Sequence, residues 1–265
     1  SELYDAWRTE KDPAKAEAGK SVALPPRAPQ VSLAGGHVAL LSQTTGQLWL
    51  TTVGQLDQFN SGSAATIDLG GRAVSAMDPS GILFAYQPAT RTVVRVDLDS
   101  AEPSTTTQKV ATRGDGAAVS LTAVAGHWAL LDPDQRTVWI DGRAVALSTL
   151  LPEGSDPVLQ QPSAHGDAVW ISSNAGLVRV PLDGGRATRP VTAAGTAAAP
   201  VTVAGCTYAA WSDGAAWRSC GASGSGERST LKDVPSGATL AFRANGDRVV
   251  LNDGRSGVSW AVQSG

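Results

Sequence analysis

"GHWALLDPDQRTVWIDGRAVAL", residues 126–147, contains three short segments of strand-forming composition separated by two turns. His127 to Leu131 is apolar and ends at the turn formers Asp132-Pro133-Asp134. Thr137 to Ile140 is β-branched and aromatic, and Asp141-Gly142 is a pair that favours a two-residue hairpin. A third short strand follows this second turn. Because a meander of this size is too small to bury a face by itself, the pattern requires further strands to pack against it.

The same order of parts recurs along the chain. Blocks of an apolar strand, a polar turn and a second strand begin at Gly36, Gly81, Gly126, Gly166, Gly205 and Gly246. By subtraction of these residue numbers, the spacings are 45, 45, 40, 39 and 41. A bulky residue follows each glycine by twelve to fourteen positions: Trp49, Val94, Trp139, Val178, Trp217 and Trp260. Four short strands at a period near forty are typical of a propeller blade. The sequence therefore predicts an all-β fold, a six-bladed β-propeller with four antiparallel strands per blade.

The ends of the repeat region predict how the ring closes. The sixth block stops soon after Trp260, which leaves no residues for an outermost strand. On the N-terminal side, "KSVAL" (20–24) parallels "RAVAL" (143–147), the fourth strand of another block. We therefore expect Ser21 to Leu24 to complete the last blade, because closure removes exposed strand edges. The propeller would span residues 20–265.

Residues 1–19 do not belong to the repeat. "SELYDAWRTEK" has Ser1 placed as a helix N-cap, and Leu3 and Trp7 lie four positions apart. A short helix and a disordered tail are both compatible with this stretch, and "DPAKAEAGK" is typical of a linker.

Composition narrows the function classes. Only 17% of residues are charged, whereas 29 glycines and 15 prolines punctuate the chain, which disfavours long exposed helices. The net charge of −3 argues against nucleic-acid binding, which needs a clustered basic surface. No apolar run approaches a membrane span, and Ser1 does not begin a signal sequence. The chain is then either cytosolic or part of a longer exported protein, and membrane anchoring would require segments outside it.

The two cysteines lie at opposed positions of a predicted hairpin. In "CTYAAWSDGAAWRSC", a three-residue loop, Ser212-Asp213-Gly214, places Ala215 opposite Trp211. The same register places Cys220 opposite Cys206, within bridging range. We expect a disulfide and an oxidising compartment. The alternative is two buried thiols in a cytosolic protein.

Other motifs carry weaker signals. His37 and His127 each follow a leading glycine, which favours a structural role, and no "GxSxG" elbow or histidine-based catalytic set is present. The tripeptide Arg113-Gly114-Asp115 lies between two blades, where turn chemistry explains it better than adhesion. The acidic turns lack the D-x-D-x-D-G spacing of a calcium loop. No metal or other cofactor is predicted.

Polar side chains gather in two kinds of loop: those between the second and third strands of a blade, and those that lead to the next blade. These loops share one face of a propeller, where binding commonly resides. The candidate ligand-binding residues are Arg91, Arg113, Asp115, Asp132, Asp134, Arg136, Asn174, Asp213, Asn252, Asp253 and Arg255. Gln43 lies on the same face, and Asp156 is a further acidic turn residue.

The predicted inner strands separate two functional hypotheses. They read "QVSLAG", "AVSAMDP", "AVSLTAV", "QQPSAHG", "APVTVAG" and "TLAFRANG". An enzyme with a metal in the central channel, a propeller hydrolase or lyase, would need acids, bases or ligands there. Because these strands are mostly Ala, Val, Ser and Thr, we favour a non-enzymatic module that binds a protein or cell-envelope component. A purely structural spacer is a third possibility.

The last third of the chain resembles a known family. "GCTYAAWSDGAAWRSCG" and "ATLAFRANGDRVVLNDGRSGVSW" are similar to the N-terminal propeller-like module of large actinobacterial cell-surface proteins with immunoglobulin-like or fibronectin type III repeats. The matching positions are Cys206, Tyr208 to Trp211, Cys220, Phe242-Arg243, Asn245, Asp247, Val249 to Asp253 and Trp260. The family usually has an Arg where this chain has Gly246, so one polar contact would be missing. The resemblance implies an exported, wall-spanning protein with a disulfide, at the cell surface or secreted, and no catalytic residues.

Overall fold

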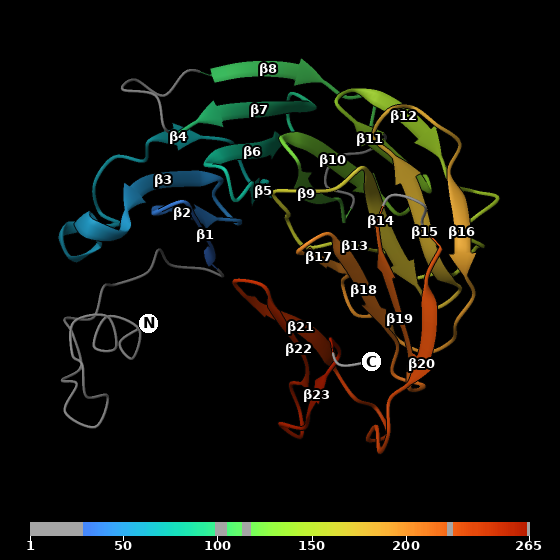
Figure 1. Ribbon diagram of the computed structural model, residues 1–265. Helices are drawn as coiled ribbons and strands as arrows, with labels where there is room; N and C mark the ends of the chain where they lie inside the picture. The colour runs from blue at the N-terminus through green and yellow to red at the C-terminus, as the bar shows by residue number, and fades with distance from the viewer. Residues whose placement is uncertain (1–28, 99–104, 113–117, 222–224, 264–265) are drawn as a thin grey trace, which may run out of the picture. The chain divides into compact units, whose positions relative to one another are not determined.

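The structure, a computed structural model, describes residues 29–98, 105–112, 118–221 and 225–263. Within these ranges the chain forms six antiparallel sheets of three or four strands and one 3₁₀ helix (Figure 1). The expected helix or linker over 1–19 and the expected closing strand over 21–24 lie outside the described residues. None of the described helices is long and apolar enough to cross a lipid bilayer.

The chain divides into two compact units, residues 1–73 and 74–265. The first unit contains one sheet, in the order β1 (Pro29–Ala34), β2 (His37–Ser42), β3 (Gln47–Thr52) and β4 (Ile67–Asp68), and the helix η1 (Val53–Gln58). Its core contains Val38, Leu40 and Trp49, against which residues of η1 and the following loop pack. The indole of Trp49 donates to the Ser63 carbonyl at 3.2 Å, which fixes that loop over the sheet.

The second unit contains five sheets that follow one another in chain order (Figure 1). The second and third sheets of the protein are β5 (Val74–Met77), β6 (Ile82–Gln87), β7 (Thr92–Asp97), β8 (Thr105–Lys109), and β9 (Ser120–Val124), β10 (His127–Asp132), β11 (Thr137–Ile140), β12 (Arg143–Ala146). The fourth and fifth are β13 (Val158–Leu159), β14 (Ala168–Ser173), β15 (Gly176–Pro181), β16 (Thr188–Val191), and β17 (Val201–Val203), β18 (Cys206–Ala210), β19 (Ala215–Cys220), β20 (Glu227–Thr230). The last sheet has three strands, β21 (Leu240–Asn245), β22 (Arg248–Asp253) and β23 (Ser259–Ala261).

The leading glycines and the bulky residues take equivalent places in the six described sheets. All six leading glycines precede the second strand of a sheet with positive φ, from 56° at Gly246 to 148° at Gly166. That backbone region favours glycine, which explains why the residue recurs there. Each bulky residue, from Trp49 to Trp260, lies in the third strand of its sheet. Asp141 and Gly142 both have positive φ, as a two-residue hairpin requires.

Hydrophobic clusters join consecutive sheets of the second unit. Trp128 and Trp139 of the third sheet pack with Phe84 and Tyr86 of the second. Further clusters join the third sheet to the fourth, the fourth to the fifth and the fifth to the last. First strands of successive sheets are also in contact, β5 with β9 and β9 with β13. The second strands therefore have apolar residues on both faces, and all six residues of β14 are buried.

One predicted inner strand is wrong. In the fourth sheet the first strand is β13, not the stretch "QQPSAHG" at 160–166. Pro162 has no N–H to donate to a ladder, and the Gln160 side chain takes a ladder position instead. Its Oε1 accepts the Trp170 N–H at 2.8 Å, and its own N–H donates to the Trp170 carbonyl at 2.9 Å. The polar stretch therefore connects two strands.

The last sheet differs from the other five. It has no fourth strand among the described residues, and burial along β22 alternates between exposed and buried. Val250 and Val258 are each 39% exposed, which is unusual for valines of this protein. One face of this sheet is therefore covered by the fifth sheet, and the other is open within the second unit.

Candidate functional site

Turns and incoming loops of the second unit are joined by hydrogen bonds. The turn after each second strand contacts the loop that enters the first strand of the same sheet or of the next one. Ser212 and Thr196 exchange two bonds. The Gly254 N–H donates to the Thr239 carbonyl, and the Thr239 N–H donates to the Asp253 carboxylate. We call this set the loop face; it consists of the turns 132–136, 173–176, 211–215 and 253–257 and the loops 147–157, 192–200 and 231–239. Within the second unit these bonds bring each turn against a neighbouring incoming loop.

Two candidate residues on the loop face are buried. Asp132 is fully buried, and its carboxylate accepts the Gln135 backbone N–H at 3.0 Å and side-chain amide at 2.7 Å. Asp253 is 1% exposed. It accepts the Ser256 hydroxyl at 2.6 Å and the backbone N–H groups of Thr239, Arg255 and Ser256. Both carboxylates are buried and accept hydrogen bonds within the loop face, and their assignment as ligand-binding residues stays a prediction.

Hydrogen bonding also shifts the pKa of Asp253. The Ser256 hydroxyl is the largest cause, and the backbone N–H groups of Arg255, Thr239 and Ser256 add to it. Burial opposes them, and together they lower the pKa of the Asp253 carboxyl to about 2. The charged carboxylate therefore stabilises the turn.

Three further candidates hold loops in place. Arg136 donates to the Leu151 carbonyl at 3.4 Å, and Asn174 donates to the Gly154 carbonyl at 3.4 Å. Arg255 donates to the Gly237 carbonyl at 2.9 Å. These bonds help to fix the shape of the loop face, and each uses one of the several N–H groups of its side chain.

The remaining candidates differ in exposure. Asp213 is exposed and accepts the Ala215 N–H, and Asn252 is half-buried and donates to the Ser259 hydroxyl. Arg91 and Asp134 are exposed, and neither side chain has a polar partner among the described residues. Arg113 and Asp115 lie outside the described residues.

A hollow of about 680 Å³ lies on the loop face between the turn at 133–136 and the loop at 152–158. Three exposed carboxylates line it, those of Asp134, Glu153 and Asp156. One cation, Arg136, also lines the hollow, and its remaining lining residues are small, rigid or apolar: Ala118, Pro133, Pro152, Gly154, Ser155, Pro157 and Val158. Sequence reasoning made Asp134 a candidate and noted Asp156 only as an acidic turn residue, and it missed Glu153, because the Pro152-Glu153 pair shows no motif.

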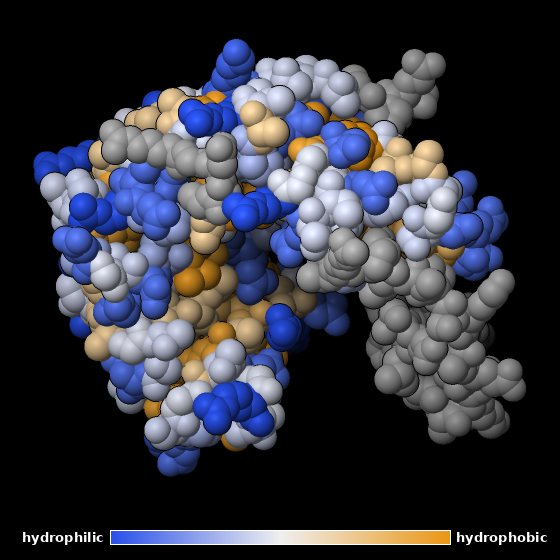
Figure 2. Space-filling view, turned by 180° about the vertical axis from the view of Figure 1, so that it is seen from behind, coloured by the Kyte–Doolittle hydropathy of each residue, from blue (hydrophilic) through white to orange (hydrophobic). Residues whose placement is uncertain are grey.

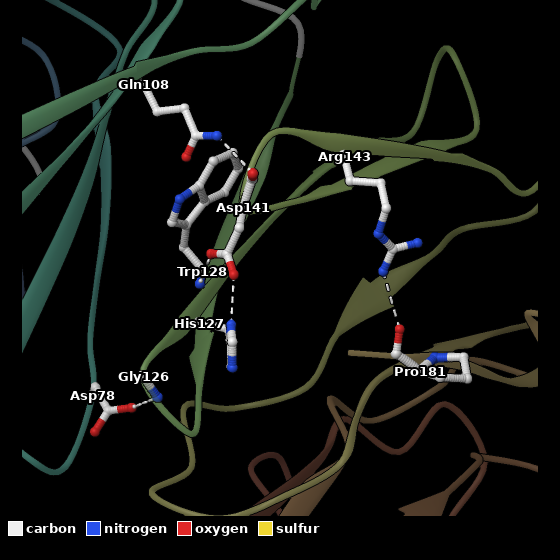
Figure 3. Close-up of polar contacts among 8 residues, drawn as sticks. All are labelled: Asp78, Gln108, Gly126, His127, Trp128, Asp141, Arg143 and Pro181. Carbon is white, nitrogen blue, oxygen red and sulfur yellow. Dashed lines mark hydrogen bonds and ion pairs between the residues drawn. The ribbon is translucent and has the colours of Figure 1, made fainter. Parts of the chain in front are cut away.

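The opposite end of the third sheet carries a second polar cluster (Figure 3). The ring of His127 lies 2.5 Å from the Asp141 carboxylate, which also accepts the Trp128 N–H. Gln108 donates to the Asp141 carbonyl at 2.6 Å, and Arg143 donates to the Pro181 carbonyl at 3.2 Å. These bonds tie the third sheet to both neighbours. The structural role expected for His127 is therefore supported, and the cluster connects neighbouring sheets.

The predicted disulfide is confirmed. Cys206 pairs with Cys220 across β18 and β19, with Cα atoms 4.0 Å apart. The Gly221 N–H donates to the Gly205 carbonyl just beyond the pair, which makes it a non-hydrogen-bonded pair. Such pairs bring side chains close together, so the bridge needs no backbone movement.

Acidic and histidine side chains of the described residues nowhere form a group of three that could hold a metal ion. Asp78, which follows the first strand β5, is buried and accepts the N–H groups of Ser80 and Gly126.

The surface carries both polar and apolar residues. On the face in Figure 2, hydrophilic residues predominate and hydrophobic residues show mainly between them.

Comparison with known proteins shows the fold. No protein-family model matches the chain, and no curated protein matches it. Streptogramin B lyase is 12% identical, with a TM-score of 0.55, over 90% of this chain and 84% of that one. BamB from Moraxella catarrhalis is 16% identical, with a TM-score of 0.50, over 86% and 67%.

The extracellular domain of BT4673 from B. thetaiotaomicron is 10% identical, with a TM-score of 0.51, over 87% of this chain and 32% of that one. These neighbours are β-propeller proteins, so the chain has a propeller-like, all-β fold. They include a lyase and an extracellular domain, so the fold alone assigns no activity.

Proposed function

We propose that the chain is a non-enzymatic, extracytoplasmic β-propeller module that binds a protein or cell-envelope component through its loop face. The observation that carries this proposal is the carboxylate-lined hollow between residues 133–136 and 152–158. Exposed Asp134, Glu153 and Asp156 outnumber the single cation, Arg136, in a site whose remaining walls are prolines and small or apolar residues. Such a site is complementary to basic groups of a partner, and it stands on loops that hydrogen bonds hold rigid.

The buried chemistry of the second unit supports binding over catalysis. Asp78, Asp132 and Asp253 are committed to backbone amides of their own turns or of the next sheet. A propeller hydrolase or lyase with a channel-bound metal is the alternative. It would need an acid, base or ligand that is not already occupied in this way.

An extracytoplasmic location is supported by the Cys206–Cys220 disulfide, because such bonds persist in oxidising compartments. The resemblance of the last sixty residues to actinobacterial surface proteins supports a place within a larger protein at the cell surface. Membrane anchoring would then come from segments outside this chain.

The six sheets are, in this proposal, the blades of a six-bladed propeller in which Ser21 to Leu24 complete the last blade. The exposed residues of the terminal sheets support closure. In β1, Val31 and Leu33 are 50% and 56% exposed, and in the last sheet Val250 and Val258 are each 39% exposed. Closure would cover apolar surface at both ends of the chain.

Capture from cell-envelope extract on the immobilised chain tests the binding site. The triple variant D134N/E153Q/D156N should lose most of the captured partner, and raised salt should weaken capture by the unchanged protein. A matched control, D183N/D233N/D247N, removes the same charge from exposed positions outside the hollow and should retain capture. Neither variant should change the melting temperature by more than a degree or two, because exposed charges contribute little to stability.

Capture that survives the triple variant would move the binding surface away from the hollow. Calcium, zinc and magnesium should change the melting temperature little, since stabilisation requires selective binding to the native state. A shift of several degrees with one of these ions, together with turnover of a hydrolase substrate, would favour the enzyme alternative.

A further inference from the structure

Each four-stranded sheet of the second unit ends in a strand that is paired along one edge only. These fourth strands are β8, β12, β16 and β20, and no described strand pairs with their other edge. Natural sheets protect such edges with charges, prolines, irregular pairing or short strands, because an open edge can pair with another chain. In Figure 1, β8 is the outermost strand of its sheet, and all five of its residues are exposed.

Three of the four edges carry such protection. β12 has only four residues and begins with Arg143. β16 contains Arg189 and Pro190, and its pairing with β15 is irregular. β20 begins with the charged pair Glu227 and Arg228. Each of these strands is therefore a poor template for a further strand.

β8 has none of these features over its first four residues. Thr105 to Gln108 are uncharged, and the first charge, Lys109, ends the strand. Threonine is β-branched and favours extended backbone. Among the fourth strands that the structure describes in the second unit, β8 therefore has the least protected edge.

The ladder between β7 and β8 decides which backbone groups of β8 point outward. The Val110 N–H donates to the Arg91 carbonyl at 2.8 Å, just beyond the last opposed pair of the two strands. Hydrogen-bonded and non-hydrogen-bonded pairs alternate from there along the ladder. Every second residue therefore directs its N–H and C=O away from β7: Thr105, Thr107 and Lys109. In the part of the chain that the structure describes, none of these outward groups has a hydrogen-bond partner.

We propose that the outward edge of β8 pairs antiparallel with the same edge of a second copy of this chain, with Thr107 opposite Thr107 on a two-fold axis. Thr105 of each copy then lies opposite Lys109 of the other. This register uses every outward group, because three opposed pairs exchange two hydrogen bonds each. A shift by two residues would leave one outward residue of each copy without a partner.

Charge and length favour a second copy over the other strand edges of the chain. In the proposed register the two Lys109 side chains are four positions apart along the paired strands, a separation of about 13 Å that exceeds the screening length at physiological salt. The central Thr107 pair is of a type that stabilises antiparallel strands. The other fourth strands of the second unit are shorter than β8 and would bring charges or a proline to its edge.

The proposed dimer does not depend on the binding site of the loop face. An edge of five residues buries little surface, so association should be weak and should depend on concentration. The dimer would carry two copies of the carboxylate-lined hollow. A partner with repeated basic groups would then be held more tightly through bivalent attachment.

Sedimentation equilibrium tests the association of the full-length chain from micromolar to millimolar concentration. The average mass should rise toward twice that of one chain. Thr107→Lys should abolish this rise, because two lysines would face each other across the axis. Ser229→Lys adds the same charge at an exposed position of β20 and should leave the rise unchanged. A single-chain mass at every concentration would overturn the proposal, as would a rise that persists in Thr107→Lys.

Proline substitution separates the backbone bonds from the charge. Thr107→Pro removes an N–H that points away from β7, so it should abolish association and leave the melting temperature nearly unchanged. Thr106→Pro removes an N–H that bonds to β7 and should lower the melting temperature by several degrees. Equal losses of stability in the two variants would overturn the assignment of the outward groups.

A single added cysteine tests the register. The two native cysteines form a disulfide, so the added thiol is the only free one. T107C should form a linked dimer on mild oxidation, because residues of a hydrogen-bonded pair lie about 5.5 Å apart, within bridging range. T105C lies on the same edge and should stay unlinked, because its counterpart would be about 13 Å away along the strands. A link in T105C but not in T107C would overturn the register, and equal linking of both would overturn the paired edge itself.

Discussion

The third and last sheets show what the repeat encodes locally and what it does not. Both place an apolar second strand opposite a third strand with a central tryptophan, with Leu130 opposite Trp139 and Leu251 opposite Trp260. In the third sheet a fourth strand follows directly after the turn at Asp141-Gly142. In the last sheet the described chain ends near β23, and its valines stay exposed. The first three strands of a sheet thus come from a local pattern, and among the described residues the last sheet has only these three.

Removing the proposed fourth strand should have the largest effect. Deletion of residues 1–25 would remove the segment proposed to complete the last sheet. Loss of that strand predicts a fall of several degrees in melting temperature. An open strand edge should also produce association, visible by size-exclusion chromatography with light scattering.

Deletion of residues 1–19 is the matched control, because it spares the segment that resembles the fourth strand of the third sheet. It should leave both the melting temperature and the monodispersity unchanged. If the longer deletion behaves like the shorter one, the last sheet does not use this segment.

Sequence periodicity was sufficient for the strands but not for every first strand. The recurring glycines and tryptophans predicted the hairpins because positive φ and a buried aromatic ring are local requirements. The first strand of the fourth sheet was misplaced, because Gln160 supplies a side-chain bond that a hydropathy pattern does not show. Hairpin register was also predictable, as the pairing of Cys206 with Cys220 shows.

The candidate site was less predictable than the fold. A carboxylate in a turn has the same sequence signature whether it faces solvent or its own backbone. Asp134 is exposed, whereas Asp132, two positions earlier, is buried beneath the same turn. Glu153 belongs to the site because the loop at 152–158 lies beside that turn in the folded chain. Contacts between loops from different repeats decide which polar residues remain available.

The disulfide should have the next largest effect. In the fifth sheet the Cys206–Cys220 disulfide links the start of β18 to the end of β19. The third sheet has the exposed His127–Asp141 pair at the corresponding place. A bridge that closes a loop of this length should contribute about 3 kcal/mol to the free energy of unfolding. Reduction, or the double variant C206A/C220A, should therefore lower the urea midpoint. His127→Ala should change the free energy of unfolding by less than about 1 kcal/mol. Two titratable thiols in the unreduced, unfolded protein would contradict the bridge.

The smallest predicted effect separates the turn carboxylates of the last sheet by their pH dependence. The pKa of Asp253 is lowered from 3.8 to about 2 in the folded protein, chiefly by the Ser256 hydroxyl. The ionised carboxylate therefore stabilises the fold above pH 4, and this contribution disappears as the pH falls toward 2. In denaturant unfolding between pH 2 and 5, the stability difference between the unchanged protein and Asp253→Asn should be largest near pH 5 and shrink on acidification. Asp213→Asn, at the equivalent turn of the fifth sheet, is the control, because Asp213 is exposed and accepts one backbone N–H. A stability difference for Asp253→Asn that stays constant over this range would show that the hydroxyl and amide bonds do not favour the charged form.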